Sequence, residues 1–166
     1  IGGSLVNGTL KVGDIIEIKP GICKGVNNLV LTTKITSLRS DNTNLKSILP
    51  GGLIGIGTEL DPYYCSDVHM SGQIIGLLGT LPEVINSVTL NYTIVNDFGC
   101  NWHPKVGDSV FLQIGTSSIE SKVTLLDDKV MTFSLSKVAC MVDGSNIIIN
   151  YKEDGIIKIA AIGSIV

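Results

Sequence analysis

Hydrophobic and polar residues alternate along much of the chain with a period of two, which is the pattern of half-buried β-strands. The clearest segments are rich in β-branched residues: 14–18, 29–35, 87–94 and 109–114. Turn-forming sequences separate such segments at short intervals: 6–8, 19–21, 126–129 and 153–155. No stretch combines a helical period with capping residues. The pattern therefore predicts an all-β protein built from antiparallel strands.

A short sequence occurs twice, each time before a predicted strand. Lys11-Val12-Gly13-Asp14 precedes the first strand and Lys105-Val106-Gly107-Asp108 precedes the last of the four. Each copy indicates a glycine turn, which is a frequent way to begin a hairpin. A boundary is expected at Leu81-Pro82-Glu83, because proline ends a strand and the alternation restarts after it. We predict two antiparallel β-barrels, residues 1–82 and residues 83–166.

Residues 50–62 carry the sequence PGGLIGIGTELDP, which concentrates glycine in an otherwise strand-like segment. Glycine recurs where the backbone turns sharply or where a ligand or a second backbone comes close. Two interpretations follow. The local pattern favours a glycine-rich barrel corner without a partner, and the other interpretation is a binding surface.

The composition is that of a folded protein, with 44% hydrophobic and 16% charged residues. Mean hydropathy is +0.40. A polar residue, a glycine or a charge nevertheless interrupts every apolar run before the roughly 18 residues that a membrane-spanning helix needs. We expect no membrane segment and a cytoplasmic location. The chain begins at Ile1 without a signal-type segment and ends at Val166, and we interpret it as a piece of a longer protein.

Cysteine and histidine give no metal-binding pattern. The four cysteines contain no C-x-x-C pair, and neither histidine has the spacing of a metal ligand: Cys23, Cys65, Cys100, Cys140, His69 and His103. No metal site is therefore predicted. A chain of this size and apolar content needs no disulfide framework, so buried free thiols are favoured.

Charge is distributed unevenly along a chain of net charge -3, in which Arg39 is the sole arginine. Residues 1–50 contain six lysine or arginine residues and three acidic residues, a balance of +3. Residues 51–100 contain five acidic residues and no lysine or arginine, a balance of -5. No basic face for nucleic acid is evident. The acidic half is either a solvated surface or a surface that meets a basic protein partner.

Several motifs, in this order, closely resemble the gamma subunit of eukaryotic and archaeal translation initiation factor 2. The motifs are Gly2-Gly3-Ser4, 10–22, 35–38, 50–58, Asp61-Pro62, Cys65, Gly72-Gln73 and 81–83. They cover domain II of that subunit, and weaker matches at 110–115 and 138–140 continue into domain III. The string P-G-G-L-I-G-x-G-T-x-x-D-P is specific to that subunit among translation GTPases, whereas L-K-V-G-D is widely shared. The resemblance identifies the chain as the C-terminal part of a divergent member.

The resemblance implies a three-domain GTPase of which this chain supplies the two β-barrels. The intact protein is expected to hold GTP and Mg²⁺ in its G domain and to form a heterotrimer with alpha and beta subunits, the beta subunit through the G domain. It is expected to deliver initiator methionyl-tRNA to the small ribosomal subunit. The chain has no G-x-x-x-x-G-K-[ST] loop, and no lysine stands beside Gly52 to Gly57 to meet phosphates. We expect this part to hold no cofactor and to have no catalytic residues.

The resemblance assigns one site to the aminoacylated 3′ end of tRNA. The matching residues are Gly2, Gly3, Gly52 and Leu53. Small residues would let the terminal adenine lie on the backbone, and apolar neighbours would give its ring a surface for stacking. The alternative is that these glycines serve the curvature of the barrel, and both roles are compatible.

A second implied site docks the C-terminal domain of the alpha subunit. Its residues are Glu59, Asp61, Pro62 and Tyr63, and Tyr64 and Asp67 extend the surface. A carboxylate held before proline can pair with lysine, arginine or backbone N–H groups of a partner. The alternative for Asp61 is an Asx residue that only forms the turn.

Three segments depart from the family pattern because they lack its basic residues: 66–70, 95–99 and 150–156. Fewer cations mean weak and salt-sensitive binding of RNA by this part of the protein. The resemblance therefore leaves two functions open. The first is the tRNA-binding and subunit-binding part of the initiation factor. The second is a β-barrel adaptor, related to translation GTPases, that binds proteins and has lost tRNA delivery.

Overall fold

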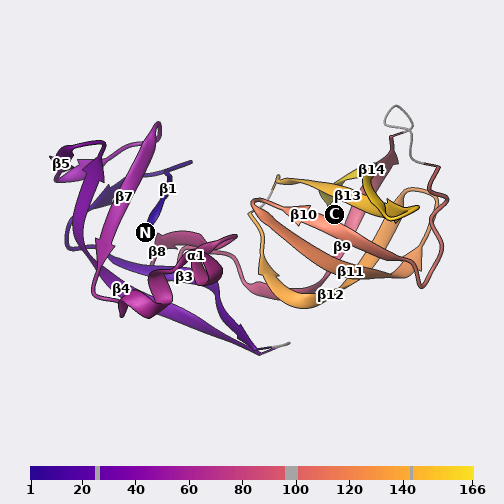
Figure 1. Ribbon diagram of the computed structural model, residues 1–166, viewed down its shortest axis with the longest axis horizontal. Helices are drawn as coiled ribbons and strands as arrows, with labels where there is room; N and C mark the ends of the chain where they lie inside the picture. The colour runs from indigo at the N-terminus through magenta and orange to yellow at the C-terminus, as the bar shows by residue number, and fades with distance from the viewer. Residues whose placement is uncertain (25–26, 96–100, 143) are drawn as a thin grey trace. The chain divides into compact units, whose positions relative to one another are not determined.

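The computed structural model describes residues 1–24, 27–95, 101–142 and 144–166, and the side chains of Cys23, Lys24, Asp67 and Val68 lie outside this description. The chain divides into two compact units (Figure 1). The first comprises Ile1–Ile22 and Val30–Leu81, and the second comprises Cys23–Leu29 and Pro82–Val166. Antiparallel strands dominate both, which confirms the predicted all-β fold class. The domain ranges 1–82 and 83–166 stay predictions.

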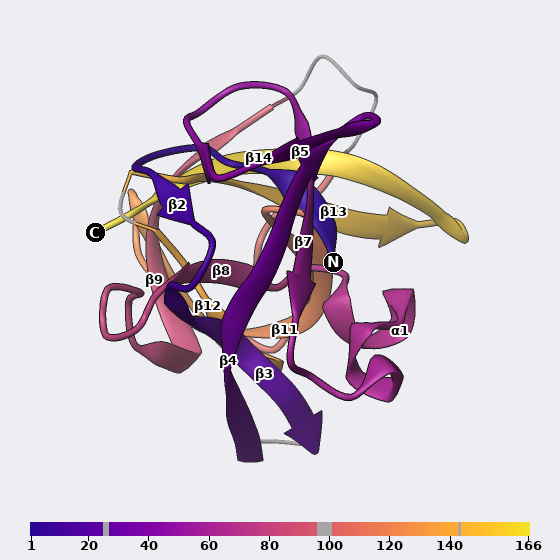
Figure 2. The same cartoon turned by 90° about the vertical axis from the view of Figure 1, so that its left-hand side faces the viewer.

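The first unit is a curled antiparallel sheet in the order β1-β7-β4-β3-β8, with β5 paired to β4 and a small sheet of β2 and β6 beside it. Figure 2 faces this unit and shows β7 beside β4. The strands are β1 (Gly2–Ser4), β2 (Leu10–Lys11), β3 (Ile15–Lys24), β4 (Asn27–Ser40), β5 (Thr43–Leu45), β6 (Ser47–Ile48), β7 (Leu53–Thr58) and β8 (Ile74–Leu77). Its core consists of Leu10, Ile16, Ile35, Leu38, Ile48, Ile54 and Ile56.

The second unit is a closed barrel of six antiparallel strands in the order β10-β11-β12-β9-β14-β13. The strands are β9 (Val84–Ile94), β10 (Ser109–Ile114), β11 (Ser117–Leu126), β12 (Val130–Cys140), β13 (Asn146–Glu153) and β14 (Ile156–Ile165). Alternate residues point inward, as in β10, where Val110, Leu112 and Ile114 are buried. Because the barrel is closed, each of these six strands is hydrogen-bonded to a neighbouring strand on both sides. The four predicted strand segments fall in β3, β4, β9 and β10, so this part of the prediction is confirmed.

The repeated sequence forms a glycine turn in the first unit. Gly13 has a φ of 98°, which favours glycine, and the Asp14 amide donates to the Lys11 carbonyl over 3.2 Å. The Asp14 carboxylate accepts from the Lys11 amide over 2.8 Å. The Gly13 amide then donates to the Ile35 carbonyl in β4 over 2.9 Å, so the turn joins the sheet directly.

The same turn recurs in the second unit. Gly107 has a φ of 99°, the Asp108 amide donates to the Lys105 carbonyl over 3.1 Å, and the Asp108 carboxylate accepts from the Lys105 amide over 3.0 Å. The Gly107 amide donates to the Val123 carbonyl in β11 over 2.8 Å. The sequence repeat is therefore a structural repeat, and its interpretation as a glycine turn before a strand is confirmed.

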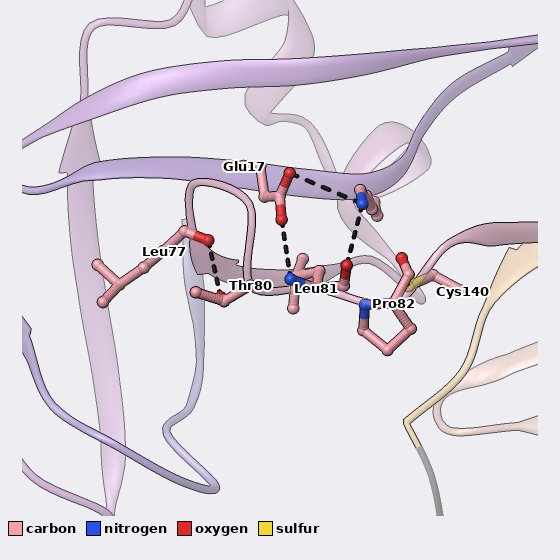
Figure 3. Close-up of polar contacts among 7 residues, drawn as sticks. Glu17, Leu77, Thr80, Leu81, Pro82 and Cys140 are labelled. Carbon is pink, nitrogen blue, oxygen red and sulfur yellow. Dashed lines mark hydrogen bonds and ion pairs between the residues drawn. The ribbon is translucent and has the colours of Figure 1, made fainter.

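Two charged residues of β3 are buried and hold the last residue of the first unit (Figure 3). Glu17 accepts from the Leu81 amide over 2.9 Å, and Lys19 donates to the Leu81 carbonyl over 3.1 Å. The two side chains also form an ion pair of 3.7 Å. Both backbone polar groups of Leu81 are therefore paired with side chains of a strand more than sixty residues earlier.

The β13–β14 hairpin closes through Asp154 and Gly155, both at positive φ. Lys158 donates to Glu153 over 2.6 Å across this hairpin. That hydrogen bond lowers the pKa of Glu153 below its ordinary value of 4.5, although partial desolvation acts in the opposite direction. Since the folded pKa is the lower one, the pair stabilises the fold above about pH 4.5, and this contribution is lost as the pH falls through the folded pKa.

Candidate functional site

The structure brings the four residues predicted for the tRNA end close together where β1 pairs with β7 (Figure 1). Gly2 lies opposite Gly55, and Gly3 lies opposite Ile54. Leu53, 73% exposed, is the first residue of β7 and follows Gly52 directly. All four residues are exposed; Gly2 lies on the same face of the strand pair as Leu53, whereas Gly3 lies opposite the buried Ile54.

Glycine occupies the positions on and near this surface for different structural reasons. Gly52 has a φ of 69°, so the turn before β7 accounts for its residue type. Gly57 is crowded, because an added Cβ would lie 2.3 Å from the Ser37 hydroxyl. At Gly2 and Gly3 an added Cβ would meet nothing within 4 Å, and neither has a positive φ. Curvature and packing therefore do not require glycine at positions 2 and 3, whereas close approach by a ligand would.

Sequence reasoning missed one basic residue on this surface. Arg39 is exposed and lies opposite Gly55, which in turn lies opposite Gly2. Directly opposite residues of antiparallel strands share a face, so the single arginine of the chain stands beside two residues without side chains. The pairing register places it there, and no local sequence signal indicates that register.

The second predicted site is a loop fixed by Asp61. Its carboxylate Oδ1 accepts from the Tyr63 amide over 2.8 Å, which caps the short 3₁₀ helix η1 (Pro62–Cys65). The Asp61 carbonyl accepts from the Tyr64 amide over 3.0 Å, and Pro62 stands at the first helical position. The turn-forming interpretation of Asp61 is therefore correct. Asp61 is also exposed, and among the described contacts only Oδ1 has a partner, so Oδ2 is open to a ligand.

The other residues of this site are accessible on the same loop. Glu59 and Pro62 are exposed, and Tyr63 is 65% exposed. The Glu59 amide donates to the Thr33 hydroxyl over 3.2 Å, which ties the loop to β4 and leaves the Glu59 side chain in solvent. The side chain of Asp67, predicted to extend the surface, lies outside the described residues. The structure thus offers an ordered, exposed acidic loop.

An aromatic cluster borders this loop. The Tyr63 ring lies 5.3 Å from that of Tyr64 and 5.0 Å from that of His69, measured between centroids. His69 belongs to the single helical turn α1 (Asp67–Met70). The sequence excludes His69 as a metal ligand by its spacing, but it does not indicate that the His69 ring contacts Tyr63.

Candidate metal ligands lie apart from one another in the described parts of the chain. No group of three or more His, Cys, Asp or Glu residues there is arranged to hold a metal ion. No described helix is long and apolar enough to cross a membrane. Cys140 is a buried free thiol, as predicted, and Cys65 is a half-buried one. Cys100 and the segment 96–99 lie outside the described residues, as does the side chain of Cys23.

No protein-family model matches the chain. Two known proteins are nevertheless similar to it in sequence over most of its length. The eukaryotic translation initiation factor 2 subunit gamma of Encephalitozoon cuniculi is 36% identical over 158 residues, covering 92% of this chain and 36% of that protein. The translation initiation factor 2 subunit gamma of Methanocaldococcus jannaschii is 33% identical over 175 residues, covering 99% of this chain and 43% of that protein. The chain therefore spans less than half the length of these relatives.

Proposed function

The chain belongs to the gamma-subunit family of translation initiation factor 2, and from this premise we propose that it provides two binding surfaces of a translation initiation factor. The acidic loop Glu59, Asp61, Pro62 and Tyr63 binds the C-terminal domain of the alpha subunit. The glycine surface Gly2, Gly3, Gly52 and Leu53 receives the 3′ end of initiator methionyl-tRNA. Two observations support the proposal: Gly2 and Gly3 of β1 lie next to the start of β7, and the acidic loop is exposed and held by the Asp61 hydrogen bond.

The assignment to the alpha subunit is supported by the rigidity and charge of the loop. The hydrogen bond from the Tyr63 amide already fixes the Asp61 side chain, so binding of a partner does not have to order it. The sequence from 51 to 100 holds five acidic residues and no lysine or arginine, which favours a basic partner. A carboxylate with a free oxygen accepts a charge-assisted hydrogen bond from such a partner.

Substituting Asp61→Asn should weaken binding to the C-terminal domain of the alpha subunit about tenfold. Asparagine keeps an oxygen that can accept from the Tyr63 amide, so the loop retains its cap and loses only the charge. Isothermal titration calorimetry with the whole 166-residue chain measures the affinity, and Glu120→Gln, at an exposed position of β11, serves as the control. Unchanged affinity would remove Asp61 from the interface, and no binding by the wild type would remove the partner itself.

The tRNA assignment is supported by open backbone at Gly2 and Gly3 beside an exposed leucine. Arg39 adds one cation to this surface. A terminal base would stack on Leu53, and Arg39 would meet a phosphate. A single cation cannot supply the affinity that several phosphate contacts give.

Initiator tRNA should therefore bind this chain alone too weakly to detect at about 150 mM salt, and binding should appear as the salt is lowered. Fluorescence anisotropy of labelled tRNA at several salt concentrations measures this. Submicromolar binding at physiological salt would contradict the charge argument. Arg39→Gln should flatten the salt dependence, whereas Lys122→Gln, on β11 of the second unit, should leave it unchanged.

The remaining functions are proposed for the protein that includes this part. GTP and Mg²⁺ binding, contact with the beta subunit and delivery of tRNA to the small ribosomal subunit in the cytoplasm belong to the longer heterotrimeric assembly, and this chain holds no cofactor. The charge balance also favours a second candidate, an adaptor that binds proteins and has lost tRNA delivery. Full-length protein that binds the alpha subunit, but not initiator tRNA in the presence of GTP, would identify the adaptor.

A further inference from the structure

The rings of Tyr63, Tyr64 and His69 form an aromatic cluster, and the Asp61 carboxylate is hydrogen-bonded to the backbone amide of Tyr63. We propose that this cluster and Asp61 together bind the guanidinium group of an arginine on the protein partner. The inference rests on the proposed docking of the alpha subunit and deepens it, because it names the chemical group that the surface recognises. It also brings in His69 and Tyr64, which lie outside the set Glu59, Asp61, Pro62 and Tyr63.

Tyr63 is the centre of the cluster. Its ring makes an edge contact with Tyr64 at an interplanar angle of 78° and a tilted contact with His69 at 50°. Two ring neighbours would ordinarily accompany burial, yet 65% of Tyr63 remains exposed. Much of the tyrosine surface is therefore available to a ligand, and its own neighbours fix the orientation of the ring.

The backbone below the cluster is tied down on both sides. The Ser66 hydroxyl donates to the Tyr63 carbonyl over 3.2 Å, and the Ser66 carbonyl accepts from the His69 amide over 2.9 Å. The Gln73 side-chain amide donates to the His69 carbonyl over 3.0 Å and to the Gly21 carbonyl over 2.9 Å. These bonds connect the cluster to β3, so the rings are positioned before a partner arrives.

Arginine suits this surface better than lysine. Its planar guanidinium stacks on an aromatic face and can donate to a carboxylate at the same time, whereas the lysine ammonium is a compact, strongly hydrated point charge. Asp61 offers its Oδ2 to the same ligand, because its Oδ1 accepts from the backbone amide of Tyr63, whose ring is the centre of the cluster. Residues 51–100 contain no lysine or arginine, so the segment that forms this surface supplies no cation of its own.

The test measures affinity for the C-terminal domain of the alpha subunit with Tyr63→Ala and Tyr63→Phe variants of the whole chain. We expect about a tenfold loss with alanine, and a loss within about twofold with phenylalanine, which keeps the ring face. His69→Ala should cost about threefold, because it removes a ring neighbour of Tyr63. Val106→Ala, at a position 63% exposed in the second unit, is the matched control and should leave affinity unchanged.

A second readout separates this inference from the partner assignment. NMR titration with N-acetyl-arginine amide should shift the Tyr63 and His69 ring resonances of the wild type, and N-acetyl-lysine amide should shift them less. Failure of the alpha domain to bind, with the arginine-specific shifts present, would overturn the proposed partner and retain the arginine site. Equal or absent shifts, or equal affinities of the Tyr63→Ala and Tyr63→Phe variants, would overturn the arginine site itself.

Discussion

Replacing Glu17 with alanine is expected to lower the free energy of unfolding by about 3 to 5 kcal/mol. Glu17 is 5% exposed, and its removal takes away the carboxylate that pairs with the 9% exposed Lys19. The Leu81 amide loses its acceptor in the same step. Removal of the carboxylate paired with a buried lysine, and of the acceptor for a part-buried amide, are changes that destabilise a domain strongly.

Urea denaturation followed by far-UV circular dichroism measures the effect. Glu120→Ala, at an exposed position of β11, is the control for removal of an acidic side chain and should change stability by less than about 0.5 kcal/mol. The double variant Glu17→Leu with Lys19→Met should be less destabilised than the sum of the two single variants, because no charge is then left buried. A cost below about 1 kcal/mol for Glu17→Ala would show that water reaches Lys19.

This ion pair also shows where sequence reasoning stops. Alternation along β3 buries Ile16 and Ile18 and would place Glu17 and Lys19 in solvent. The structure buries all four, because the segment around Leu81 covers the second face of the strand. The alternation along a strand indicates which face is buried against its own sheet. It cannot indicate that a segment more than sixty residues away covers the second face of the strand.

Local features, in contrast, can be predicted well. Strand β10 coincides with the predicted segment 109–114, and the glycine turns at Gly13 and Gly107 have almost the same φ. Each depends on alternation or on a few adjacent residues. Closure of the second barrel is a long-range property, since it requires β13 to pair with β10, yet the all-β pattern is sufficient to predict the fold class.

The candidate sites likewise combine features that the sequence predicts with features that depend on the fold. Resemblance indicates Asp61 and Leu53 but cannot show that Asp61 caps a 3₁₀ helix or that Arg39 lies opposite Gly55. Both facts depend on the path of the backbone. The contact between Tyr63 and His69 is hidden for the same reason, because rings six positions apart in an irregular segment have no fixed spatial relation. Side-chain chemistry can thus be read from the sequence, whereas the combination of groups at one surface requires the fold.

The second large effect is expected at Asp108, where alanine should cost about 2 to 4 kcal/mol. The Asp108 carboxylate accepts from the indole Nε1 of Trp102 over 2.8 Å as well as from the Lys105 amide. Trp102 is 4% exposed and stacks on Tyr151 with centroids 5.6 Å apart. Loss of the carboxylate leaves a buried indole N–H without its acceptor, in addition to the loss of the turn contact.

The repeated turn supplies a matched control for this prediction. Asp14 makes the same turn contact with the Lys11 amide, and that contact is exposed, so Asp14→Ala should cost only about 1 kcal/mol. Trp102 is the one tryptophan of the chain, so its fluorescence reports unfolding of the second unit directly. Asp108→Asn keeps an acceptor oxygen and should fall between the wild type and Asp108→Ala. Equal costs for the Asp14 and Asp108 alanine variants would mean that the turn, and not the bond to Trp102, is what Asp108 contributes.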